Sequence, residues 1–513
     1  MTQRSRTIAL SLMLAAPAAA GGGGSAGRGP ETAADGSRPN IVVVMTDDLD
    51  SVSFHAALEA GLLPHIRRLF ARGTEFRQSF VSESLCCPSR STYLTGLYPH
   101  NHGVVRNSGT RGGFAGFMRA FGDNNLALWL QAAGYRTGQV GKYLNGYVDG
   151  TLVPRGWDDW QALVGPSTYC MYDYDLSDNG HVVHHGHRPV KDYQTDVLAA
   201  LAERFVLAGR AGADSRPFFL NVAPLAPHGE RFCGVEGVRA APRHRGTPPL
   251  PLPEPPSFNE ADMSDKPAWM QALPLLDETA IATLYNQRIA SLRAVDDLVG
   301  RVGGALRAIG ELPRTAFVFT SDNGFLLGRH RWEAKTLGYE ESIRVPLLLR
   351  VPRVHRPMAV DDEIVLNNDL APTIAALAGS APRLVMDGRS LLPLLEGTAR
   401  SWRKRFLAAY PPRAEERAAD DPDLADGLSV VPPFFAVRTG ADGDLSDLVY
   451  SETTNLTGMV VARELYDLHR EVDPFQVASR HDDPAYLSRR RRLEQQLELL
   501  KTCGNGTCRT REE

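Results

Sequence analysis

The chain has 513 residues, of which 43% are hydrophobic and 23% are charged, a composition typical of an ordinary globular protein. Its length allows two to four domains, although α/β enzymes often place most of such a length around one sheet. The net charge of -4 gives no reason to expect nucleic acid or an anionic membrane as a partner.

The first twenty residues have the pattern of a secretory signal peptide. Arg4 and Arg6 precede an apolar run at residues 8–20 that ends in small residues with an Ala-x-Ala pattern. We therefore predict export, with cleavage near Ala20, to a periplasmic or extracellular location. A membrane anchor is the weaker alternative, because a span needs roughly 20 apolar residues. Residues 21–39 are expected to form a flexible N-terminus, and no membrane span is expected after cleavage.

Apolar runs alternate with helical patterns over the next part of the chain. Strands are predicted at residues 40–45, 136–140, 217–222 and 315–320, and helices at residues 62–70, 125–133, 285–309 and 369–378. This alternation predicts a mostly parallel, doubly wound α/β sheet, which we assign to a catalytic domain at residues 40–400. The proline-dense segment 242–256 is expected to be a surface insertion, and residues 382–397 a crossover.

The pattern changes near residue 401. Shorter strands are predicted at residues 434–438 and 448–451, followed by a helix at 486–500. We assign residues 401–513 to a smaller C-terminal α+β domain. Four consecutive arginines at 489–492 are expected to form a solvated helix face and not a binding patch.

Six cysteines in an exported chain suggest disulfides. Cys503 and Cys508 flank a turn-forming loop that suits a small bridge, and residues 170 and 233 are candidates for a second bridge. Cys86 and Cys87 would then remain as thiols, since adjacent cysteines rarely form an unstrained bridge. Two buried structural thiols are the ordinary explanation for such a pair.

Polar residues follow two of the predicted strands. Asp47 and Asp48 follow the first strand, and Asp322 and Asn323 follow the strand at 315–320. Ligands bind at the carboxyl edge of open α/β sheets, where these oxygens would meet. An Asp-Asp pair alone more often forms a turn or a helix cap, but the second segment favours a site for Ca²⁺ or Mg²⁺ and disfavours zinc.

Four cationic or titratable residues have positions that suit an anion site. Lys142 and His228 come shortly after predicted strands, Arg90 lies in a helix-like run at 89–94, and Lys335 follows the Asp322 segment. Singly, each has an ordinary explanation, such as a surface lysine or a loop histidine. Together they would stabilise the negative charge that develops when a small anionic ester is cleaved.

The segment around Cys86 resembles a known signature. The stretch Cys-Cys-Pro-Ser-Arg at 86–90, followed by Leu-Thr-Gly at 94–96, is similar to that of the type I sulfatases, whose first cysteine is oxidised to Cα-formylglycine. The resemblance extends from residue 40 to residue 468. It implies an alkaline-phosphatase-like fold, a formylglycine-generating enzyme as a maturation partner, and a divalent ion, usually Ca²⁺ with Mg²⁺ possible, held by Asp47, Asp48, Asp322, Asn323 and the modified Cys86.

The resemblance also implies roles for the other residues. Hydrated formylglycine at position 86 would attack sulfur, with one hydroxyl left to expel sulfate, which a serine lacks. Arg90 would hold the diol and the ion, Lys142 and Lys335 would neutralise the sulfate oxygens, and His228 would donate to the leaving alcohol.

Three stretches, at residues 98–102, 141–145 and 172–180, resemble the N-acetylglucosamine-6-sulfatase and heparan endosulfatase branch. Two positions depart from common patterns: Leu144 replaces a histidine of the arylsulfatases, and Tyr93 replaces an aliphatic residue. We therefore expect an exported sulfatase of sulfated carbohydrate, with N-acetylglucosamine 6-sulfate units of glycosaminoglycans as the first candidate substrate. Specificity is expected to come from loops such as 167–180 and the proline-rich insertion.

Three alternatives remain open. The first is an aryl sulfatase. The second is a phosphomonoester or phosphonate hydrolase of the same superfamily, which the cysteine at position 86 disfavours. The third is a non-catalytic protein that binds sulfated glycans, which the intact set of site residues disfavours.

Overall fold

The computed structural model describes residues 38–209, 215–235, 237–352, 354, 359–412 and 431–513. The predicted signal peptide at 1–20 and nearly all of the segment 21–39 lie outside these residues and stay predictions. Within the described part of the chain, no helix combines the length and the apolarity that a membrane span requires.

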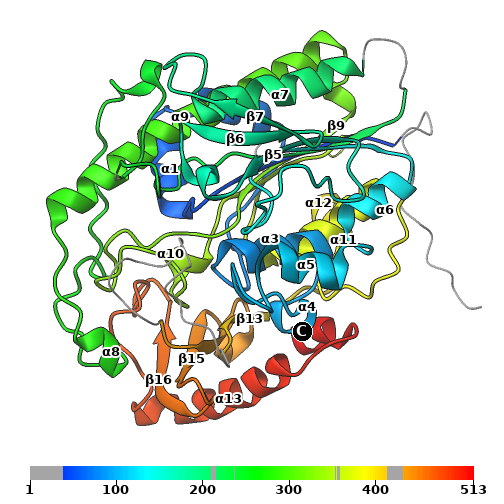
Figure 1. Ribbon diagram of the computed structural model, residues 1–513. Helices are drawn as coiled ribbons and strands as arrows, with labels where there is room; N and C mark the ends of the chain where they lie inside the picture. Colours follow the sequence, from blue (N-terminus) through cyan, green and yellow to red (C-terminus); the bar gives the residue numbers. More distant parts are fainter. Residues whose placement is uncertain (1–37, 210–214, 236, 353, 355–358, 413–430) are drawn as a thin grey trace, which may run out of the picture.

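A ten-stranded sheet forms the centre of the larger unit, in the order β11-β2-β10-β9-β1-β8-β4-β5-β6-β7 (Figure 1). The five central strands, from β9 to β5, run parallel, whereas β10, β6 and β7 pair antiparallel with their neighbours. The strands are β1 (Asn40–Thr46), β2 (Thr74–Phe76), β4 (Arg136–Gly141), β5 (Asp159–Val164), β6 (Tyr174–Asp178), β7 (His181–His185), β8 (Phe218–Ala223), β9 (Thr315–Ser321), β10 (Leu347–Arg350) and β11 (Ala359–Asp361). A separate pair joins β3 (Ser79–Phe80) to β12 (Val365–Leu366).

Strand β1 shows why both faces of this sheet are covered. Val42 and Val44 belong to one hydrophobic cluster, and Ile41, Val43 and Met45 belong to another. Side chains alternate between the two faces of a strand, so a continuous apolar run must be buried on both sides. Helices accordingly pack on each face, and the predicted doubly wound, mostly parallel sheet is confirmed.

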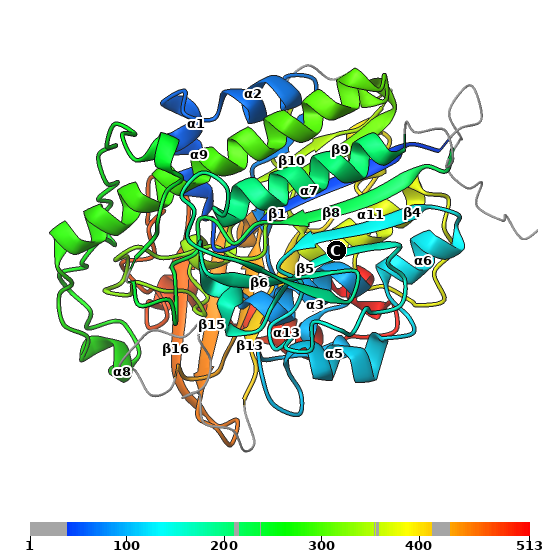
Figure 2. The ribbon, with the colours of Figure 1, turned by 45° about the horizontal axis from the view of Figure 1, so that its top comes forward.

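The helices divide between the two faces (Figure 2). One face packs against α1 (Ser51–Glu59), α2 (Pro64–Phe70), α7 (Gln194–Ala208) and α9 (Glu278–Ala308). The other packs against α3 (Cys86–Thr95), α5 (Gly113–Phe121), α6 (Leu126–Ala132), α11 (Leu370–Leu377) and α12 (Leu392–Glu396). Shorter helices are α4 (Pro99–His102), α8 (Ala268–Gln271) and α10 (Glu340–Ile343).

The strands and helices predicted for residues 40–400, including the helix-like run at 89–94, are all present, with ends that differ by a few residues. The largest shift is in α9, which begins at Glu278 because Asp277 accepts hydrogen bonds from the backbone N–H groups of Thr279 and Ala280. The stretch 167–180, expected to be a loop, contains the strand β6, which lies between β5 and the edge strand β7. Its half-polar sequence lacks the continuous apolar run of the buried parallel strands. The proline-rich segment 242–256 holds only the short 3₁₀ turn Pro242–His244, as expected.

The C-terminal part forms a second, antiparallel sheet in the order β13-β14-β15-β16. Its elements are β13 (Arg405–Tyr410), β14 (Phe434–Thr439), β15 (Leu448–Thr454), β16 (Val460–Asp467), α13 (Leu487–Lys501) and α14 (Thr507–Arg511). Helix α13 buries Leu493, Leu497 and Leu500 at the spacing of one helix face, while the arginines at 489–492 lie half-buried or exposed. The predicted smaller C-terminal α+β unit is confirmed. The exact boundary at residue 400 stays a prediction.

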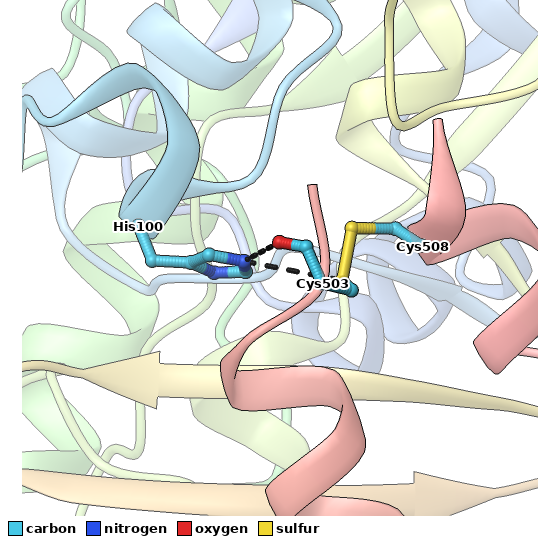
Figure 3. Close-up of side chains that lie close together, drawn as sticks. All are labelled: His100, Cys503 and Cys508. Atoms are coloured by element: carbon cyan, nitrogen blue, oxygen red, sulfur yellow. Dashed lines mark hydrogen bonds between the residues drawn. A yellow bond between two sulfur atoms is a disulfide. The ribbon is translucent and has the colours of Figure 1, made fainter. Parts of the chain in front are cut away.

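Both expected disulfides are formed. Cys170 bonds to Cys233, and Cys503 bonds to Cys508, which leaves Cys86 and Cys87 as buried thiols. His100 donates a hydrogen bond from Nε2 to the carbonyl oxygen of Cys503 at 2.9 Å (Figure 3). Because the sulfur atoms of residues 503 and 508 bond to each other, this cluster is a structural link and not a metal site.

From the burial of His102, at the end of α4, we predict that the stability of the fold falls in acid. The backbone N–H of Val104 donates to its Nδ1, so that nitrogen carries no proton. Burial, and then the nearby His100, lower the pKa of His102 from 6.5 to about 3. The unfolded chain therefore binds a proton that the folded chain does not, and stability falls as the pH drops from 6.5 towards 3.

We expect His102→Gln to flatten this dependence by about 1.4 kcal/mol per pH unit within that window. Urea unfolding at several pH values measures the difference. Parallel profiles for the wild type and the variant would contradict the assignment, whatever their absolute stabilities.

Candidate active site

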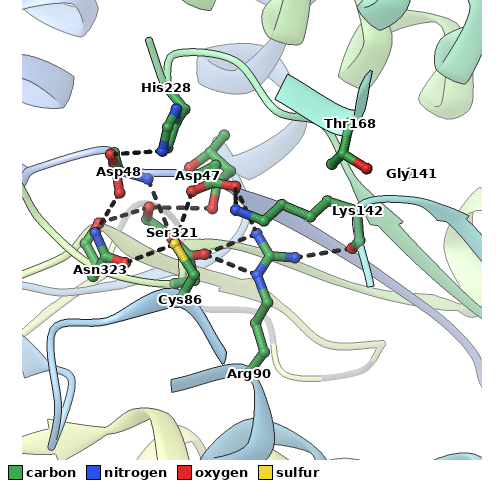
Figure 4. A network of polar contacts seen from close by, with 12 residues as sticks. Asp47, Asp48, Cys86, Arg90, Gly141, Lys142, Thr168, His228, Ser321 and Asn323 are labelled. Carbon is green, nitrogen blue, oxygen red and sulfur yellow. Dashed lines mark hydrogen bonds and ion pairs between the residues drawn. The ribbon is translucent and has the colours of Figure 1, made fainter. Parts of the chain in front are cut away.

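The carboxyl ends of the central parallel strands supply most of the candidate residues. Asp47 and Asp48 follow β1, Lys142 follows β4, His228 lies beyond β8, and Asp322 follows β9. Figure 4 shows His228 directed at Asp48, Lys142 directed at Asp47, and the side chain of Cys86, which begins α3, beside Asp47 and Asn323. The structure thus brings together residues that are separated by up to 288 positions, from Asp47 to Lys335.

The helix after β1 is capped by Asp50, and not by Asp47 or Asp48. Asp50 is the N-cap of α1, and its Oδ1 accepts the backbone N–H of Ser53 at 2.7 Å. Asp48 has a φ of 64°, in the left-handed region that asparagine and aspartate tolerate best among residues with a side chain. Its backbone N–H donates to Asp322 Oδ1 at 3.2 Å, so the two acidic segments are joined directly.

Helix α3 starts at Cys86, three residues before the predicted start, because Pro88 falls in the first turn, where no backbone N–H is needed. Asn107 Oδ1 accepts the backbone N–H of Cys87 at 2.9 Å. The Sγ of Cys86 lies 3.4 Å from Asp47 Oδ1 and 3.7 Å from Asn323 Oδ1. The side chain of residue 86 therefore projects into the acidic cluster, whereas that of residue 87 belongs to the hydrophobic cluster behind the helix.

Arg90 lies one turn beyond Cys86 and bridges two carboxylates. Its Nε donates to Asp322 Oδ2 at 2.8 Å, and its Nη2 donates to Asp47 Oδ2 at 3.2 Å. A third bond runs from Nη1 to the carbonyl oxygen of Lys142 at 2.9 Å. The guanidinium is buried at 3% exposure, so these bonds fix the helix against the ends of β1, β4 and β9.

Gly141 sets the position of Lys142. Its φ is 99°, and a Cβ there would come within 2.2 Å of the Ala223 carbonyl oxygen, so only glycine fits beside β8. The ammonium of Lys142 then lies 2.6 Å from Asp47 Oδ2. The close packing of residue 141 against Ala223 therefore explains why a glycine precedes the lysine.

Lys335 and His228 both approach the carboxylate of Asp48. The Nζ of Lys335 is 2.5 Å from Asp48 Oδ1 and 2.9 Å from Cys86 Sγ. His228 Nε2 lies 3.5 Å from Asp48 Oδ2, while its Nδ1 lies 2.6 Å from the Gly229 carbonyl oxygen. That carbonyl can only accept, so Nδ1 carries a proton and Nε2 is the nitrogen that faces the site.

The charges of the site explain its shifted pKa values. Burial alone would raise the pKa of Asp47, but Lys142, His228, Arg90 and Lys335 hold it well below its ordinary value. Burial, and then the charge of Asp47, raise the pKa of Asp322. The thiol of Cys87 has its pKa raised to about 12 by burial, so it stays protonated and unreactive at neutral pH.

The donor set fits a hard divalent cation. Asp47, Asp48, Cys86 and Asp322 are all buried and each offers a ligand atom, with these atoms within 4.8 Å of one another. Asn323 adds an amide oxygen beside them. Three buried carboxylates with oxygen donors suit Ca²⁺ or Mg²⁺, and the described residues of this cluster include no second thiol that would favour zinc.

One supporting residue was not predicted from the sequence. Arg288, on α9, donates from Nη1 to the Pro227 carbonyl oxygen at 3.2 Å and from Nη2 to the Asp48 carbonyl oxygen. It thereby ties the loop of His228 to the end of β1. The sequence contained a signal for this residue, because Arg288 lies three residues after Tyr285 and therefore on the apolar face of the helix. The structure buries it there, at 2% exposure.

Comparison with known proteins identifies the family. Residues 39–380, well over half of the chain, match the family model described as sulfatase. The chain belongs to the sulfatase family. It is therefore a sulfuric ester hydrolase, as its resemblance to the type I sulfatases predicted.

Relatives with different substrate names match this sulfatase over most of its length. An arylsulfatase of Volvox carteri is 33% identical over 93% of this chain and 76% of its own length. The human N-acetylglucosamine-6-sulfatase is 34% identical over 93% of this chain and 87% of its own length.

A solved structure described as a complex with its substrate D-glucosamine-2-N,6-O-disulfate superposes with a TM-score of 0.69 and 25% identity. The superposition covers 90% of this chain and 97% of the other. It confirms the predicted alkaline-phosphatase-like sulfatase fold.

Proposed function

We propose that this sulfatase is exported and removes 6-sulfate groups from N-acetylglucosamine units of sulfated carbohydrate, using formylglycine made from Cys86. The observation that carries the proposal is the position of Cys86. Its sulfur lies in one buried site with three carboxylates, and the Nζ of Lys335 is 2.9 Å from it. A relative named N-acetylglucosamine-6-sulfatase and a structural neighbour with a sulfated glucosamine support the substrate. Two disulfides support an oxidising, extracytoplasmic location.

The cysteine sulfur marks the place where the modified side chain would stand. Once oxidised by a formylglycine-generating enzyme, residue 86 supplies a hydrated aldehyde, whose two hydroxyls provide a nucleophile and a group able to expel sulfate. Ca²⁺, or Mg²⁺ as the second choice, would be held by Asp47, Asp48, Asp322, Asn323 and residue 86, and supplies Lewis-acid polarisation there.

The chain's own cations bind and orient the substrate. The Lys142 ammonium lies against Asp47, and the Lys335 ammonium lies against Asp48 and the side chain of residue 86, so a sulfate placed beside residue 86 would be near two positive charges. Arg90, held by Asp47 and Asp322, keeps residue 86 and the carboxylates in register. This arrangement binds a small anion where an uncompensated acidic cluster would repel it.

His228 is placed to handle the proton of the leaving alcohol. Its Nδ1–H donates to the Gly229 carbonyl oxygen, which fixes the ring and leaves Nε2 as the exchanging atom. Nε2 faces the site and lies 3.5 Å from Asp48 Oδ2. A proton held at Nε2 can pass to the sugar oxygen as the bond to sulfur breaks.

The two hydrolase alternatives predict different substrate preferences. The name of the Volvox relative keeps aryl sulfates as the second candidate. Leu144, where the arylsulfatases have histidine, is 3% exposed and packs in the hydrophobic cluster behind β4, so this position offers no polar group to a leaving phenol. Phosphate monoesters are the third candidate.

A substrate panel tests the proposal. We expect kcat/KM for N-acetylglucosamine 6-sulfate to exceed that for N-acetylgalactosamine 6-sulfate by about tenfold or more, since a site that hydrogen-bonds one hydroxyl arrangement rejects the other. A chromogenic aryl sulfate and a phosphate monoester complete the panel. Preference for the aryl ester would establish the second candidate, and dominant phosphate hydrolysis would overturn the first.

A further inference from the structure

One aromatic ring lies against two of the proposed catalytic side chains. Tyr169 ends the short 3₁₀ helix Pro166–Tyr169 and is 5% exposed. The Lys142 Nζ lies 4.8 Å from the centroid of its ring, and the imidazole of His228 lies 5.3 Å from it, tilted by 51°. The ring therefore contacts side chains from two different strand ends, those after β4 and β8.

The hydroxyl group of this tyrosine is also held. Asn145 Nδ2 donates to the Tyr169 hydroxyl oxygen at 2.7 Å, and Asn145 lies only three residues after Lys142. The ring is thus fixed at its edge by the same segment that carries the lysine. Three groups from outside the 166–169 turn determine where the ring stands.

A disulfide fixes the backbone on the other side. Cys170, the next residue, bonds to Cys233, five residues after His228. The Arg231 backbone N–H donates to the Tyr169 carbonyl oxygen at 3.3 Å, and the Met171 N–H donates to Glu230 Oε1 at 2.8 Å. The turn with the aromatic ring and the loop with His228 are therefore joined by one covalent bond and two hydrogen bonds.

We propose that Tyr169 is a positioning residue for Lys142 and His228, and that the bridge between Cys170 and Cys233 holds it in place. The face of an aromatic ring attracts cations while staying neutral. It can therefore lie against the Lys142 ammonium and the His228 imidazole without a further carboxylate, whose charge would repel the sulfate substrate. This inference rests on the proposed roles of residues 142 and 228.

Two substitutions at position 169 separate the ring from its hydroxyl. We expect Tyr169→Leu to lower kcat by about 10- to 100-fold with little change in KM, because small misplacements of catalytic groups cost that much. Tyr169→Phe keeps the ring and is expected to retain most of the activity. Rates are normalised to the formylglycine content of residue 86, measured by mass spectrometry, so that incomplete maturation is not mistaken for misplacement.

The disulfide is tested against a matched control. Replacing Cys170 and Cys233 with serine is expected to lower kcat, whereas the same change at Cys503 and Cys508 leaves it unchanged. On the background without the bridge between residues 170 and 233, Tyr169→Leu is expected to cost less than in the wild type, since both changes act through one ring.

The outcomes separate this inference from the proposed function. Full activity in Lys142→Ala and His228→Ala would refute the proposed roles of those residues, and this inference with them. If those variants lose activity while Tyr169→Leu keeps wild-type kcat, the positioning inference alone fails. Equal losses in the Leu and Phe variants would also overturn it, because they would assign the effect to the hydroxyl. Additive effects of Tyr169→Leu and the loss of the bridge would refute the part assigned to the disulfide.

Discussion

Replacing Cys86 with alanine is expected to abolish sulfate ester hydrolysis while leaving the fold intact. Alanine lacks the sulfur through which Cβ is oxidised to an aldehyde, so no formylglycine can form, and losing a nucleophile costs a hydrolase about a thousandfold or more in kcat. The side chain contacts Asp47, Asn323 and Lys335 but is small, so its loss leaves the helix in place. Turnover of N-acetylglucosamine 6-sulfate and near-ultraviolet circular dichroism measure the two effects.

Cys87 provides a matched control one residue away. It is also fully buried, but its thiol lies in the hydrophobic cluster and its pKa is raised to about 12 by burial. We expect Cys87→Ala to keep wild-type kcat/KM and to cost only about 1 kcal/mol of stability, as small core truncations do. Full activity in Cys86→Ala, or loss of activity only in the Cys87 variant, would refute the assignment of the nucleophile.

Arg403→Met is expected to lower the free energy of unfolding by about 3–5 kcal/mol, because it leaves buried carboxylates without their partner. The guanidinium is 2% exposed and lies 2.6 Å from Asp369 Oδ2 and 2.9 Å from Glu512 Oε2. Burial would lower the pKa of Arg403, but Asp369 and Glu512 outweigh it and raise that pKa. These contacts tie the C-terminal segment to the start of α11.

A surface arginine shows what an ordinary ion pair contributes. Arg492 pairs with Asp444 at 2.6 Å, but the two side chains are 48% and 58% exposed. We expect Arg492→Met to change stability by less than about 1 kcal/mol, since exposed pairs are weak. Guanidinium unfolding followed by tryptophan fluorescence compares the two variants. Equal midpoints for Arg403→Met and the wild type would contradict a structural role for the buried network.

Much of the fold could be predicted because its signals are local. The apolar runs of β1 and β9 and the three- and four-residue spacing of α9 do not depend on the rest of the chain. The strand order could not be predicted, because it depends on pairing between strands that are distant in sequence. Strands β6 and β7 were missed because both are short and partly polar and lack a continuous apolar run. The buried network around Arg403 depends on Glu512, which is 109 residues away.

The candidate site divides in the same way. Asp47, Asp322 and Arg90 follow strand ends or a helix start, so a sequence pattern points to them. Tyr169 acts through the faces of its ring, and its contacts depend on the loops that meet at the 170–233 bridge. The contacts of the Tyr169 ring with Lys142 and His228 produce no regular spacing in the sequence from which they could be predicted. The pairing of cysteines 170 and 233 was the nearest available signal.

The state of residue 86 tests the central claim most directly. The measurement is the mass of the peptide that contains Cys86, taken from protein purified from its native host. Oxidation to formylglycine replaces the sulfur and two hydrogens with one oxygen, and the account predicts this lighter peptide, reactive with carbonyl reagents. An unmodified cysteine at position 86 in active enzyme would contradict the proposed mechanism.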